Sequence, residues 1–427
     1  MTEAALRSSA TPRVLLVDSS RPASNLPLWG MSIAERVLRQ ASLCGIEYVV
    51  VYVGSDVEWE LHRWRPDLRD IHPLQIDVVQ SAEQLADVMP DLEGGLLVAD
   101  GDVVHDDRLW HHLLAAGPDH CVTATETTLV WLSAQHWHAV LEKSSEQFVG
   151  VRQLAQGLNS TTVEQLDTYV PELRLTMPAF MIRLTERSQL RHVDHLLYRR
   201  TFKGVIDAIA RYGYYHLVRL LTRCLSRTTL SPNLFTVLSI TGIWLAIPCF
   251  ATGHVALGCV SAWAGVLLDS IDGKLARLTL NLSDAMGTIE HLSAMPGLGL
   301  WFVAIGWHLT DGDLWTPSVA MLSCWTTVAC FLVDKVVSGE FRRRFGRELF
   351  DARPFDALFH LFAVRRNMHL LVLTIGVAAG LVESAFVAMA AGMVLTLAIH
   401  VLRFAWIGLT GGVREDLTGG VRGRAEA

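Results

Sequence analysis

Two carboxylates near the middle of the chain have the spacing to bind a cation. Asp269 and Asp272 stand three residues apart, at the end of a run that is otherwise apolar enough to enter a membrane. Residues three apart lie on the same face of a helix, so both side chains can point at one spot. Leaving either carboxylate unpaired beside lipid would cost roughly 2.5–3.5 kcal/mol. A cation is therefore expected here, most simply a divalent one, and the alternative is a helix end whose acids are solvated by water.

The composition indicates a soluble domain joined to a membrane domain. The 427 residues are 51% hydrophobic and 19% charged, with a mean hydropathy of +0.32, which is too apolar for an ordinary soluble protein. The formal net charge of −7 and the lack of a nucleic-acid-binding pattern exclude a nucleic-acid partner. The seven cysteines form no C-x-x-C pair and are interpreted as reduced packing residues. Residues 1–13 lack the apolar core of a signal peptide, so the first domain is expected in the cytoplasm.

The first half of the chain predicts an α/β fold, doubly wound around a mostly parallel sheet. Strands are expected at 14–17, 46–53, 74–79 and 96–99, with helices at 56–64, at 82–88 and after Ser32, which could cap its helix. Strands that alternate with helices place helices on both faces of the sheet. Ligands bind at the carboxyl ends of such strands, where Asp18, Asp100 and Asp102 fall.

This half resembles a sugar-nucleotidyltransferase domain, through Leu26-Pro-Leu-Trp-Gly30 and Val98-Ala-Asp-Gly-Asp102. The resemblance implies that Asp100 or Asp102 holds Mg²⁺ on a nucleotide. The sequence departs from the family in three ways. The loop 18–25 has no glycine to bring its backbone close to a triphosphate, Leu26 replaces a lysine, and Phe180-Met-Ile-Arg-Leu-Thr185 stands where a second metal-binding Asp is expected. The domain has therefore lost catalysis or is a divergent, active cytidylyltransferase.

The junction between the halves is basic. Residues 186–231 carry nine arginines and lysines, with apolar residues at helical spacing from Ile206 to Cys224. This pattern predicts an amphipathic helix that lies in the membrane interface, with its cations near anionic lipid head groups. The alternative is a linker helix packed on the soluble domain.

The second half predicts six membrane-spanning helices. Apolar runs lie at about 234–252, 254–271, 286–309, 317–337, 369–382 and 385–406, and the fifth is short for a bilayer. The connections at 251–254, 310–313 and 383–384 contain no Lys or Arg, whereas the other connections are rich in them. The positive-inside rule then places both termini in the cytoplasm, in a multi-pass protein of the cell's inner (cytoplasmic) membrane.

The segment Asp269-x-x-Asp272-Gly273-x-x-Ala276-Arg277 resembles the signature of the CDP-alcohol phosphotransferase (phosphatidyltransferase) family, and Ser231-Pro-Asn233 matches the family before the first span. The resemblance implies an all-α six-helix transmembrane domain, a CDP-alcohol donor, a hydroxyl acceptor, contact with membrane lipid and a homodimer. A nucleotidyltransferase-like domain fused to this membrane domain is a known arrangement. The expected divisions are a nucleotidyltransferase-like domain (1–190), an amphipathic segment (191–232), the membrane domain (233–410) and a cytoplasmic tail (411–427).

The same resemblance implies a site at the cytoplasmic edge of the membrane. Carboxylates would hold Mg²⁺ or Mn²⁺, which neutralises the pyrophosphate and stabilises the leaving CMP. Small residues leave room for the cytidine to approach the helix backbone. Arg277 would answer phosphate charge, or alternatively mark the cytoplasmic boundary. The implied metal ligands are Asp269, Asp272 and Glu290, and the implied CDP-alcohol contacts are Asn233, Gly273, Ala276, Arg277 and Gly287.

The second half of the family signature is broken. The ungapped register puts Met286 at the family glycine, Glu290 at the third acid and Ala294 at the fourth. One inserted residue puts Gly287 at the glycine but His291 at the third acid, so we prefer the first register, which keeps a carboxylate. The fourth acid is the family's proposed general base. Glu290 and His291 are the nearby groups that could replace it, since a histidine with a pKa near neutrality can act as a base. The histidine is equally readable as a packing residue.

The expected function is therefore transfer of a phospho-alcohol group from a CDP-alcohol to a hydroxyl acceptor, with release of CMP, in phospholipid or inositol-phosphate-type synthesis. The alternative is a catalytically impaired membrane protein that binds nucleotide or lipid as a scaffold or regulator. A set of arginines could bind a phosphorylated acceptor or serve topology alone: Arg342, Arg343, Arg344, Arg365 and Arg366.

Overall fold

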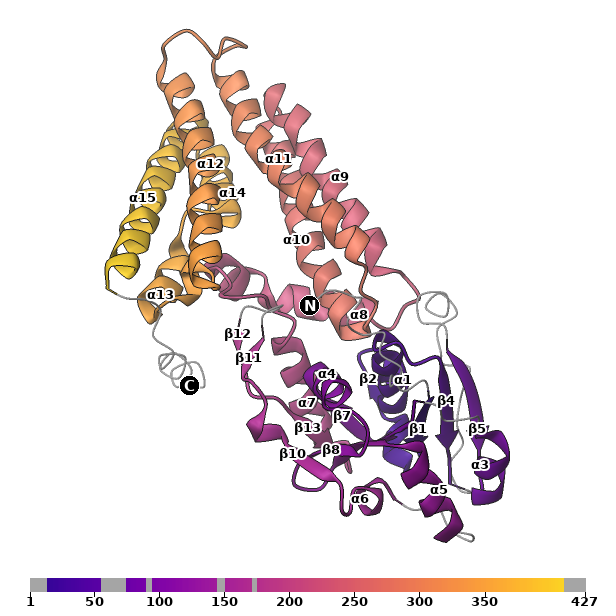
Figure 1. Cartoon of the computed structure of the whole chain (residues 1–427). Coiled ribbons are helices and arrows are strands. Elements are labelled where there is room, and N and C mark those ends of the chain that lie inside the picture. The colour runs from indigo at the N-terminus through magenta and orange to yellow at the C-terminus, as the bar shows by residue number, and fades with distance from the viewer. Residues whose placement is uncertain (1–13, 55–73, 90–93, 144–149, 171–174, 411–427) are drawn as a thin grey trace.

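The chain forms an α/β half and an all-helical half. The structure, a computed structural model, describes residues 14–54, 74–89, 94–143, 150–170 and 175–410. In Figure 1 the α/β half lies below and the long helices rise above it. The fold class predicted from the sequence is confirmed. The predicted helix at 56–64 and the tail from 411 lie outside the described residues.

A seven-stranded sheet forms the centre of the α/β half, in the order β10-β8-β9-β6-β1-β4-β5. Its parallel core consists of β6 (Leu96–Asp100), β1 (Val14–Asp18), β4 (Tyr48–Tyr52) and β5 (Gln75–Val79). These are the four strands that the sequence predicts. The sheet is mixed rather than wholly parallel, because β9 (Thr128–Leu132) runs antiparallel to β6 and to β8 (His120–Thr123); β10 (Asn159–Thr162) pairs parallel with β8.

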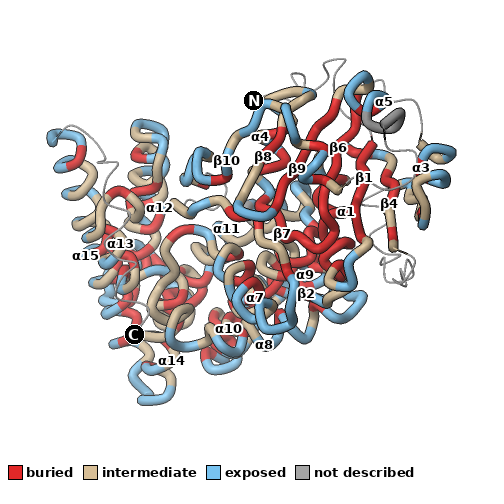
Figure 2. Tube along the Cα trace, turned by 90° about the horizontal axis from the view of Figure 1, so that it is seen from below, coloured by how far each residue is buried: buried red, intermediate tan, exposed pale blue. Residues whose placement is uncertain are grey.

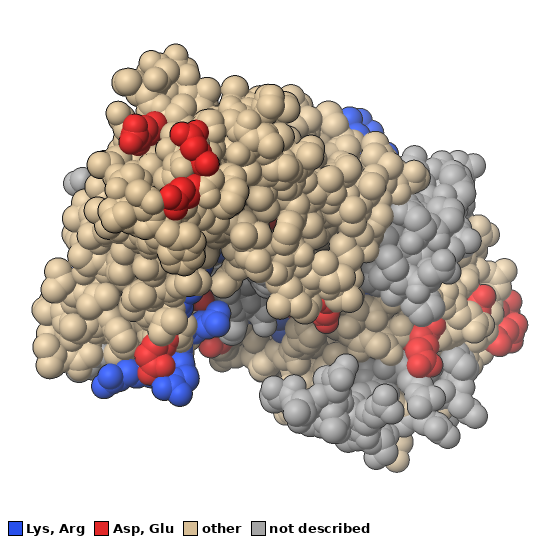
Figure 3. All heavy atoms as spheres, turned by 90° about the horizontal axis from the view of Figure 1, so that it is seen from above, with Lys and Arg blue, Asp and Glu red and all other residues tan. Residues whose placement is uncertain are grey.

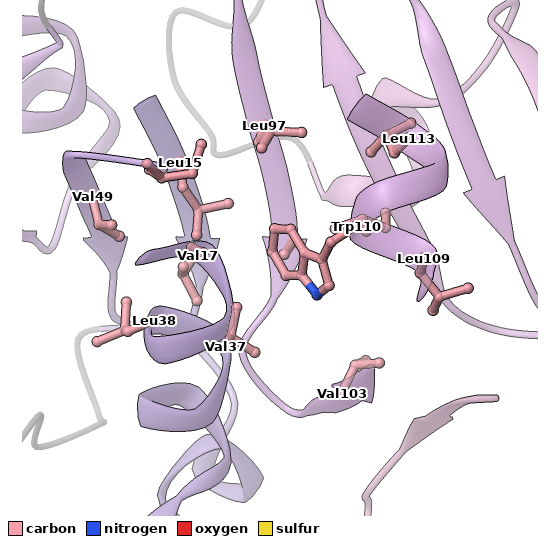
Figure 4. Close-up of a cluster of buried hydrophobic side chains, with 14 of the residues drawn as sticks. Leu15, Val17, Val37, Leu38, Val49, Leu97, Val103, Leu109, Trp110 and Leu113 are labelled. Carbon is pink, nitrogen blue, oxygen red and sulfur yellow. The ribbon is translucent and has the colours of Figure 1, made fainter. Parts of the chain in front are cut away.

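Helices cover both faces of the sheet because its central strands are buried on both sides. Along β1, Leu15 and Val17 face the core shared with α1 (Ile33–Leu43) and α4 (Asp107–Ala116), as Figure 4 shows. Val14 and Leu16 face the opposite core, where α3 (Ala82–Val88), α5 (Ala134–Lys143) and α6 (Val151–Leu154) pack. Figure 2 shows β1, β6 and β9 buried along their length. The predicted Ser32 cap is confirmed, because its side chain accepts from the Glu35 N–H at 3.1 Å.

Six helices are long and apolar enough to cross a membrane among the described residues. They are α9 (Pro232–Ala251), α10 (Val255–Thr279), α11 (Asp284–Leu309), α12 (Val319–Phe345), the pair α13 (Pro354–Phe362) and α14 (Arg366–Ala379), and α15 (Val382–Leu409). The short fifth run is explained by the break between α13 and α14. Seen from the end away from the α/β half, the surface of these helices is mostly uncharged, with a few acidic groups (Figure 3). The six helices fit a multi-pass membrane protein.

Glycines bring α9 and α10 into close contact. A Cβ on Gly242 would lie 3.0 Å from the Gly265 Cα, so the two backbones approach where neither residue has a side chain. Ser239 donates to the Gly265 carbonyl at 2.9 Å, and Ser261 donates to the Gly242 carbonyl at 2.8 Å. Small residues and hydroxyl groups are the usual means of packing helices within a membrane. This contact fixes α10, the helix that carries Asp269, against α9.

The two halves meet at the C-terminal end of α10. Two arginines of α1 reach its last turn: Arg36 donates to the Leu278 carbonyl at 2.8 Å and Arg39 donates to the Thr279 carbonyl at 2.7 Å. Leu278 itself packs in a cluster of α/β-half side chains. The last carbonyls of a helix have no partner within it, so the α/β half supplies the partners that end α10.

The basic junction is helical but not one continuous helix. It contains α7 (Leu190–Arg199), a π-helical turn η5 (Ile209–Gly213) and α8 (Tyr215–Leu225). Helix α8 packs on α10 and exposes Leu217, Leu220 and Leu221. Part of the predicted amphipathic segment is therefore helical, as α8, and its position in a membrane interface stays a prediction.

Candidate functional site

The α/β half gathers three acids at the carboxyl edge of its sheet. Asp18 ends β1 and Asp100 ends β6, and the two are direct neighbours in the parallel register. Asp102 follows two residues later, and all three are buried. The loop after β1, which lacks glycine, forms a short 3-10 helix, η2 (Pro22–Asn25). Asp18 is used locally, since its Oδ1 accepts from the Ser20 N–H and hydroxyl at 3.1 and 2.6 Å.

Two arginines neutralise the other two acids. Arg183 donates to the Asp100 Oδ2 at 2.5 Å and to both Asp102 oxygens at 3.1 Å. Arg21 adds a contact to the Asp102 Oδ2 at 3.2 Å. Arg183 lies on β13 (Met181–Arg183), in the segment where the nucleotidyltransferase resemblance expected a metal-binding Asp. A guanidinium therefore stands against the carboxylates that were expected to hold Mg²⁺.

Burial strongly affects the protonation of these acids. Burial, together with the neighbouring Asp102 and Asp18 carboxylates and against the opposing effect of Arg21, raises the pKa of Asp100 to about 7. Burial also raises the pKa of Asp102 to about 6, against the opposing effect of Arg21. Three of the four carboxylate oxygens of Asp100 and Asp102 accept from Arg183. This arrangement leaves a metal ion little access to either acid.

The membrane half has its own acids in the C-terminal part of α10. The Asp269 Oδ2 accepts from Arg366, the first residue of α14, at 2.6 Å. The Asp269 side chain is 14% exposed and the Arg366 side chain 28% exposed, so the pair is half sheltered. Arg366 belongs to the arginine set that the sequence assigned to an acceptor or to topology. The structure places it on the signature acid instead.

The Asp272 carboxylate, unlike that of Asp269, is not paired with an arginine in the described part of the chain. Asp272 is 2% exposed, and its Oδ1 accepts from the Gly273 N–H at 2.5 Å. Its Oδ2 is buried and makes no hydrogen bond of good geometry among the described residues, although the Thr236 side chain lies beside this carboxylate. The Nε of Arg277 is also buried and without a partner there, and the two charged groups are near enough to interact. A buried donor and a buried acceptor left without partners cost free energy, about 1–3 kcal/mol each, which a ligand can recover.

The small residues of the signature lie near the Asp272 carboxylate and the Arg277 guanidinium. A Cβ on Gly273 would lie 3.1 Å from the Arg277 Nη2, so the guanidinium folds over the glycine. Ala276 is half-buried. Gly287 has nothing within 4 Å of where a Cβ would lie, which leaves space at the start of α11. Asn233 is half-buried in the first turn of α9, with its backbone N–H on Ser231 at 3.3 Å.

Glu290 joins the acids of α10, whereas the fourth position does not. The Glu290 carboxyl, on α11, lies in hydrogen-bonding contact with the Asp269 carboxyl. Ala294, one turn further along α11, carries no polar group. The His291 side chain lies outside the described part of the chain, so its predicted role as a base stays a prediction.

The carboxylate oxygens of these acids are suitable ligands for a divalent ion, but the acids are not arranged as a complete metal site. Carboxylate oxygens are the ligands that Mg²⁺ prefers, and Asp269, Asp272 and Glu290 supply them, one with a buried oxygen that has no partner. Among the described residues, no three His, Cys, Asp or Glu side chains meet in a group that could hold a metal ion. Arg366 already occupies one oxygen of Asp269.

Sequence reasoning missed the polar contacts that surround Arg366. Asn367 donates through its Nδ2 to the Asp207 Oδ2 at 2.7 Å and to the Tyr214 hydroxyl at 2.9 Å. These contacts tie the start of α14 to the junction segment. The signal available in the sequence was an Asn directly after two arginines, which is too weak to name a partner 160 residues away. Arg342 and Arg343 lie elsewhere, near Glu348 and Glu340.

Comparisons with known proteins give weak likenesses. No family model matches the chain, and no curated protein matches it. Phosphatidylinositol phosphate synthase of Mycobacterium tuberculosis, solved with CDP-DAG bound, is 17% identical with a TM-score of 0.34, over 44% of this chain and 94% of that one. Its structure with manganese and citrate gives 16% and 0.34, over 44% and 88%. The inositol-1-phosphate CTP transferase of T. maritima gives 11% and 0.30, over 44% and 95%. Likenesses this weak carry no argument about the site, so we infer its chemistry from its own residues.

Proposed function

We propose that the membrane half is a CDP-alcohol phosphotransferase that binds its donor at the cytoplasmic end of α10. The observation that carries this proposal is the open pair at that site: the Asp272 Oδ2 and the Arg277 Nε are buried, lie near one another and have no partner among the described residues. A pyrophosphate with a cation beside it supplies both of the missing partners. The signature residues Asn233, Gly273, Ala276 and Gly287 would border the bound CDP-alcohol.

The reaction forms one phosphate ester bond and breaks the phosphoanhydride bond of the CDP-alcohol. The acceptor hydroxyl oxygen attacks the phosphorus that carries the alcohol, and the bond from that phosphorus to the CMP oxygen breaks. The hydroxyl proton passes to Glu290 or, as the alternative, to His291. Arg277 faces the negative charge of the phosphate oxygens. A divalent ion, Mg²⁺ or Mn²⁺, would be held by Asp269, Asp272 and Glu290, and when bound it would neutralise pyrophosphate charge.

The same proposal includes the domain boundaries, the membrane topology and the oligomeric state. The chain would divide at about residues 190 and 232, lie in the inner membrane with both termini in the cytoplasm, and pair as a homodimer. We assign no nucleotidyl transfer to the α/β half. The contacts of Arg183 and Arg21 on Asp100 and Asp102 support a structural role for those acids.

The test is release of CMP by the purified full-length protein. The protein is incubated with radiolabelled CDP-diacylglycerol or CDP-inositol, a panel of hydroxyl acceptors, and Mg²⁺ or Mn²⁺. We expect CMP release that Asp272→Asn lowers by about 100-fold, since metal-site and charge-stabilising groups contribute on that scale. Asp284→Asn makes the same chemical change at an exposed acid of the next helix and should leave the rate unchanged. Full activity in Asp272→Asn would exclude the proposed site.

Binding without turnover is the second candidate. Two observations favour it: Arg366 neutralises Asp269, and Ala294 stands at the fourth acid position. In this case the CDP-alcohol binds, in an Asp272-dependent way, but no CMP appears with any acceptor. Ala294→Asp is then expected to restore CMP release, because it returns the missing carboxylate one turn after Glu290. The protein would serve as a scaffold or regulator that responds to the ligand.

A further inference from the structure

A cavity lies where the α/β half meets the junction helices α7 and α8. Its volume is about 790 Å³, within the range of small-molecule sites. Its walls are the hairpin of β2 (Pro27–Leu28) and β3 (Met31–Ser32), helix α7, and the end of α8 with the segment that follows it. None of the signature acids of α10 or the sheet acids lines it. The cavity is therefore separate from the sites described above.

The hairpin wall is held in one position. Trp29 and Gly30 form its turn with φ of +52° and +81°, the left-handed region that a tight hairpin requires. A Cβ on Gly30 would lie 1.7 Å from the Ser226 carbonyl oxygen, so only glycine lets the turn lie against the end of α8. Trp29 also stacks on Tyr198 of α7, with ring centroids 5.7 Å apart. The cavity is thus bounded by a fixed wall rather than by a loose loop.

The lining of the cavity is strongly basic. Arg191, Arg219, Arg223 and Arg227 face a single acid, Asp194. Asp194 is buried and already contacts Arg219 at 2.7 Å and Arg223 at 3.7 Å. Arg191 and Arg227 are exposed and make no ion pair with any residue that the structure describes. The cavity therefore carries an excess of positive charge that its own residues do not neutralise.

The position of the cavity brings it to the membrane surface. Thr228 and Thr229 line it, and the first membrane helix begins three residues later at Pro232. Helix α8 carries its arginines on this side and its exposed leucines, Leu217 and Leu220, on the other. A helix of this kind lies in the interface with its apolar face in the lipid.

We propose that this cavity binds a phosphate ester. Guanidinium groups recognise phosphate oxygens by paired, charge-assisted hydrogen bonds. Among the arginines of the cavity, Arg191 and Arg227 are not engaged in an ion pair with a described residue, so their N–H groups are available to a phosphate. The Thr228 and Thr229 hydroxyls add neutral donors beside them. The phosphate has two sources within reach, the headgroup of an anionic phospholipid and a soluble phosphate ester from the cytoplasm. Either would bind independently of the CDP-alcohol site.

The experiment measures binding to the full-length protein in neutral detergent, without an activity readout. One arm titrates short-chain phosphatidylglycerol against short-chain phosphatidylcholine, and the other titrates sn-glycerol 3-phosphate. The double variant Arg191→Gln, Arg227→Gln should weaken binding at least tenfold, since both arginines lose their charge-assisted hydrogen bonds to the phosphate. Because neither arginine holds another described residue, the thermal midpoint of the variant should match that of the wild type.

A matched variant separates this site from general attraction to anions. Arg152→Gln with Arg199→Gln removes the same charge from exposed arginines outside the cavity and should change binding by less than about twofold. Preference for phosphatidylglycerol assigns the site to a lipid headgroup, and binding of glycerol phosphate assigns it to a soluble ester. Equal weakening in both double variants, or no weakening in the first, overturns the proposal.

Discussion

Both halves of the molecule place an arginine on the acids expected to hold a metal ion, but they do so to different degrees. In the α/β half, Arg183 contacts Asp100 and both oxygens of Asp102. In the membrane half, Arg366 contacts only Asp269, and the Asp272 Oδ2 keeps no partner among the described residues. One charge cluster is complete within the protein, whereas the other has a buried acceptor left over.

The difference separates a structural role at one acid cluster from a ligand-binding role at the other. A buried acid pair that is fully paired contributes to folding and offers nothing to a ligand, because binding would first have to break the internal contacts. A pair that is half satisfied has free energy left for a ligand to recover. This contrast is why we assign ligand chemistry to α10 and not to the sheet edge.

The largest expected effect is at the complete cluster. Arg183→Leu leaves Asp100 and Asp102 buried without their main partner, and breaking a buried ion pair in this way costs about 3–5 kcal/mol. Denaturant unfolding of the full-length protein at pH 8, followed by tryptophan fluorescence, measures this loss. Arg152→Leu, at an exposed arginine of the same half, serves as the control. A loss below 1 kcal/mol for Arg183→Leu would show that the sheet-edge acids are not a structural cluster.

The same change in the membrane half should cost less. Arg366→Leu leaves one acid without its arginine at a partly exposed site, with an expected loss of about 1–3 kcal/mol. The variant should also bind Mn²⁺ more tightly than the wild type, because the freed Asp269 oxygen joins Asp272 and Glu290. Thermal midpoints with and without Mn²⁺ measure both effects. Unchanged Mn²⁺ affinity would mean that Arg366 does not compete with a cation.

The protonation of the sheet-edge acids gives a smaller effect. The folded-state pKa of Asp100 is raised to about 7 from its ordinary value of 3.8, so the folded protein binds a proton that the unfolded chain has lost. This contribution to stability is complete below pH 3.8 and is lost as the pH rises to about 7. Asp100→Asn should therefore flatten the fall in unfolding free energy between pH 4 and 7. A parallel pH profile in wild type and variant would contradict the raised pKa.

The smallest effect is at the helix that links the two sites. Ser32→Ala removes the cap of α1, which costs about 1 kcal/mol in typical helices. Ser81→Ala removes the equivalent cap from α3, which touches neither cluster. Because α1 holds Arg36 and Arg39 on α10, the first variant should also weaken CDP-alcohol binding, while the second should lower stability alone. Equal ligand binding in the two variants would mean that α1 does not position α10.

Local patterns in the sequence were enough to predict the elements but not the contacts between them. The apolar runs of β1 and β6, the Ser32 cap and the six long helices each follow from residues close together in the chain. Strands such as β10, Asn159–Thr162, were missed because they are short and polar and show no alternation. The contacts of Arg366 and Arg183 join residues 97 and 83 positions apart, so only the folded chain reveals them. The two sequence resemblances singled out these acids as metal ligands, which stays a prediction, and they could not reveal which arginines contact them.

The hydrogen bonds from Arg36 and Arg39 to the end of α10 have a consequence for how the protein comes apart. The guanidinium groups are buried and the carbonyls they bind have no other means of being satisfied inside the last turn. Separating the halves would leave the guanidinium groups of Arg36 and Arg39 without acceptors and the carbonyls of Leu278 and Thr279 without donors. The two halves are therefore expected to behave as a single cooperative unit and to melt in one transition, instead of as two modules that a linker merely tethers.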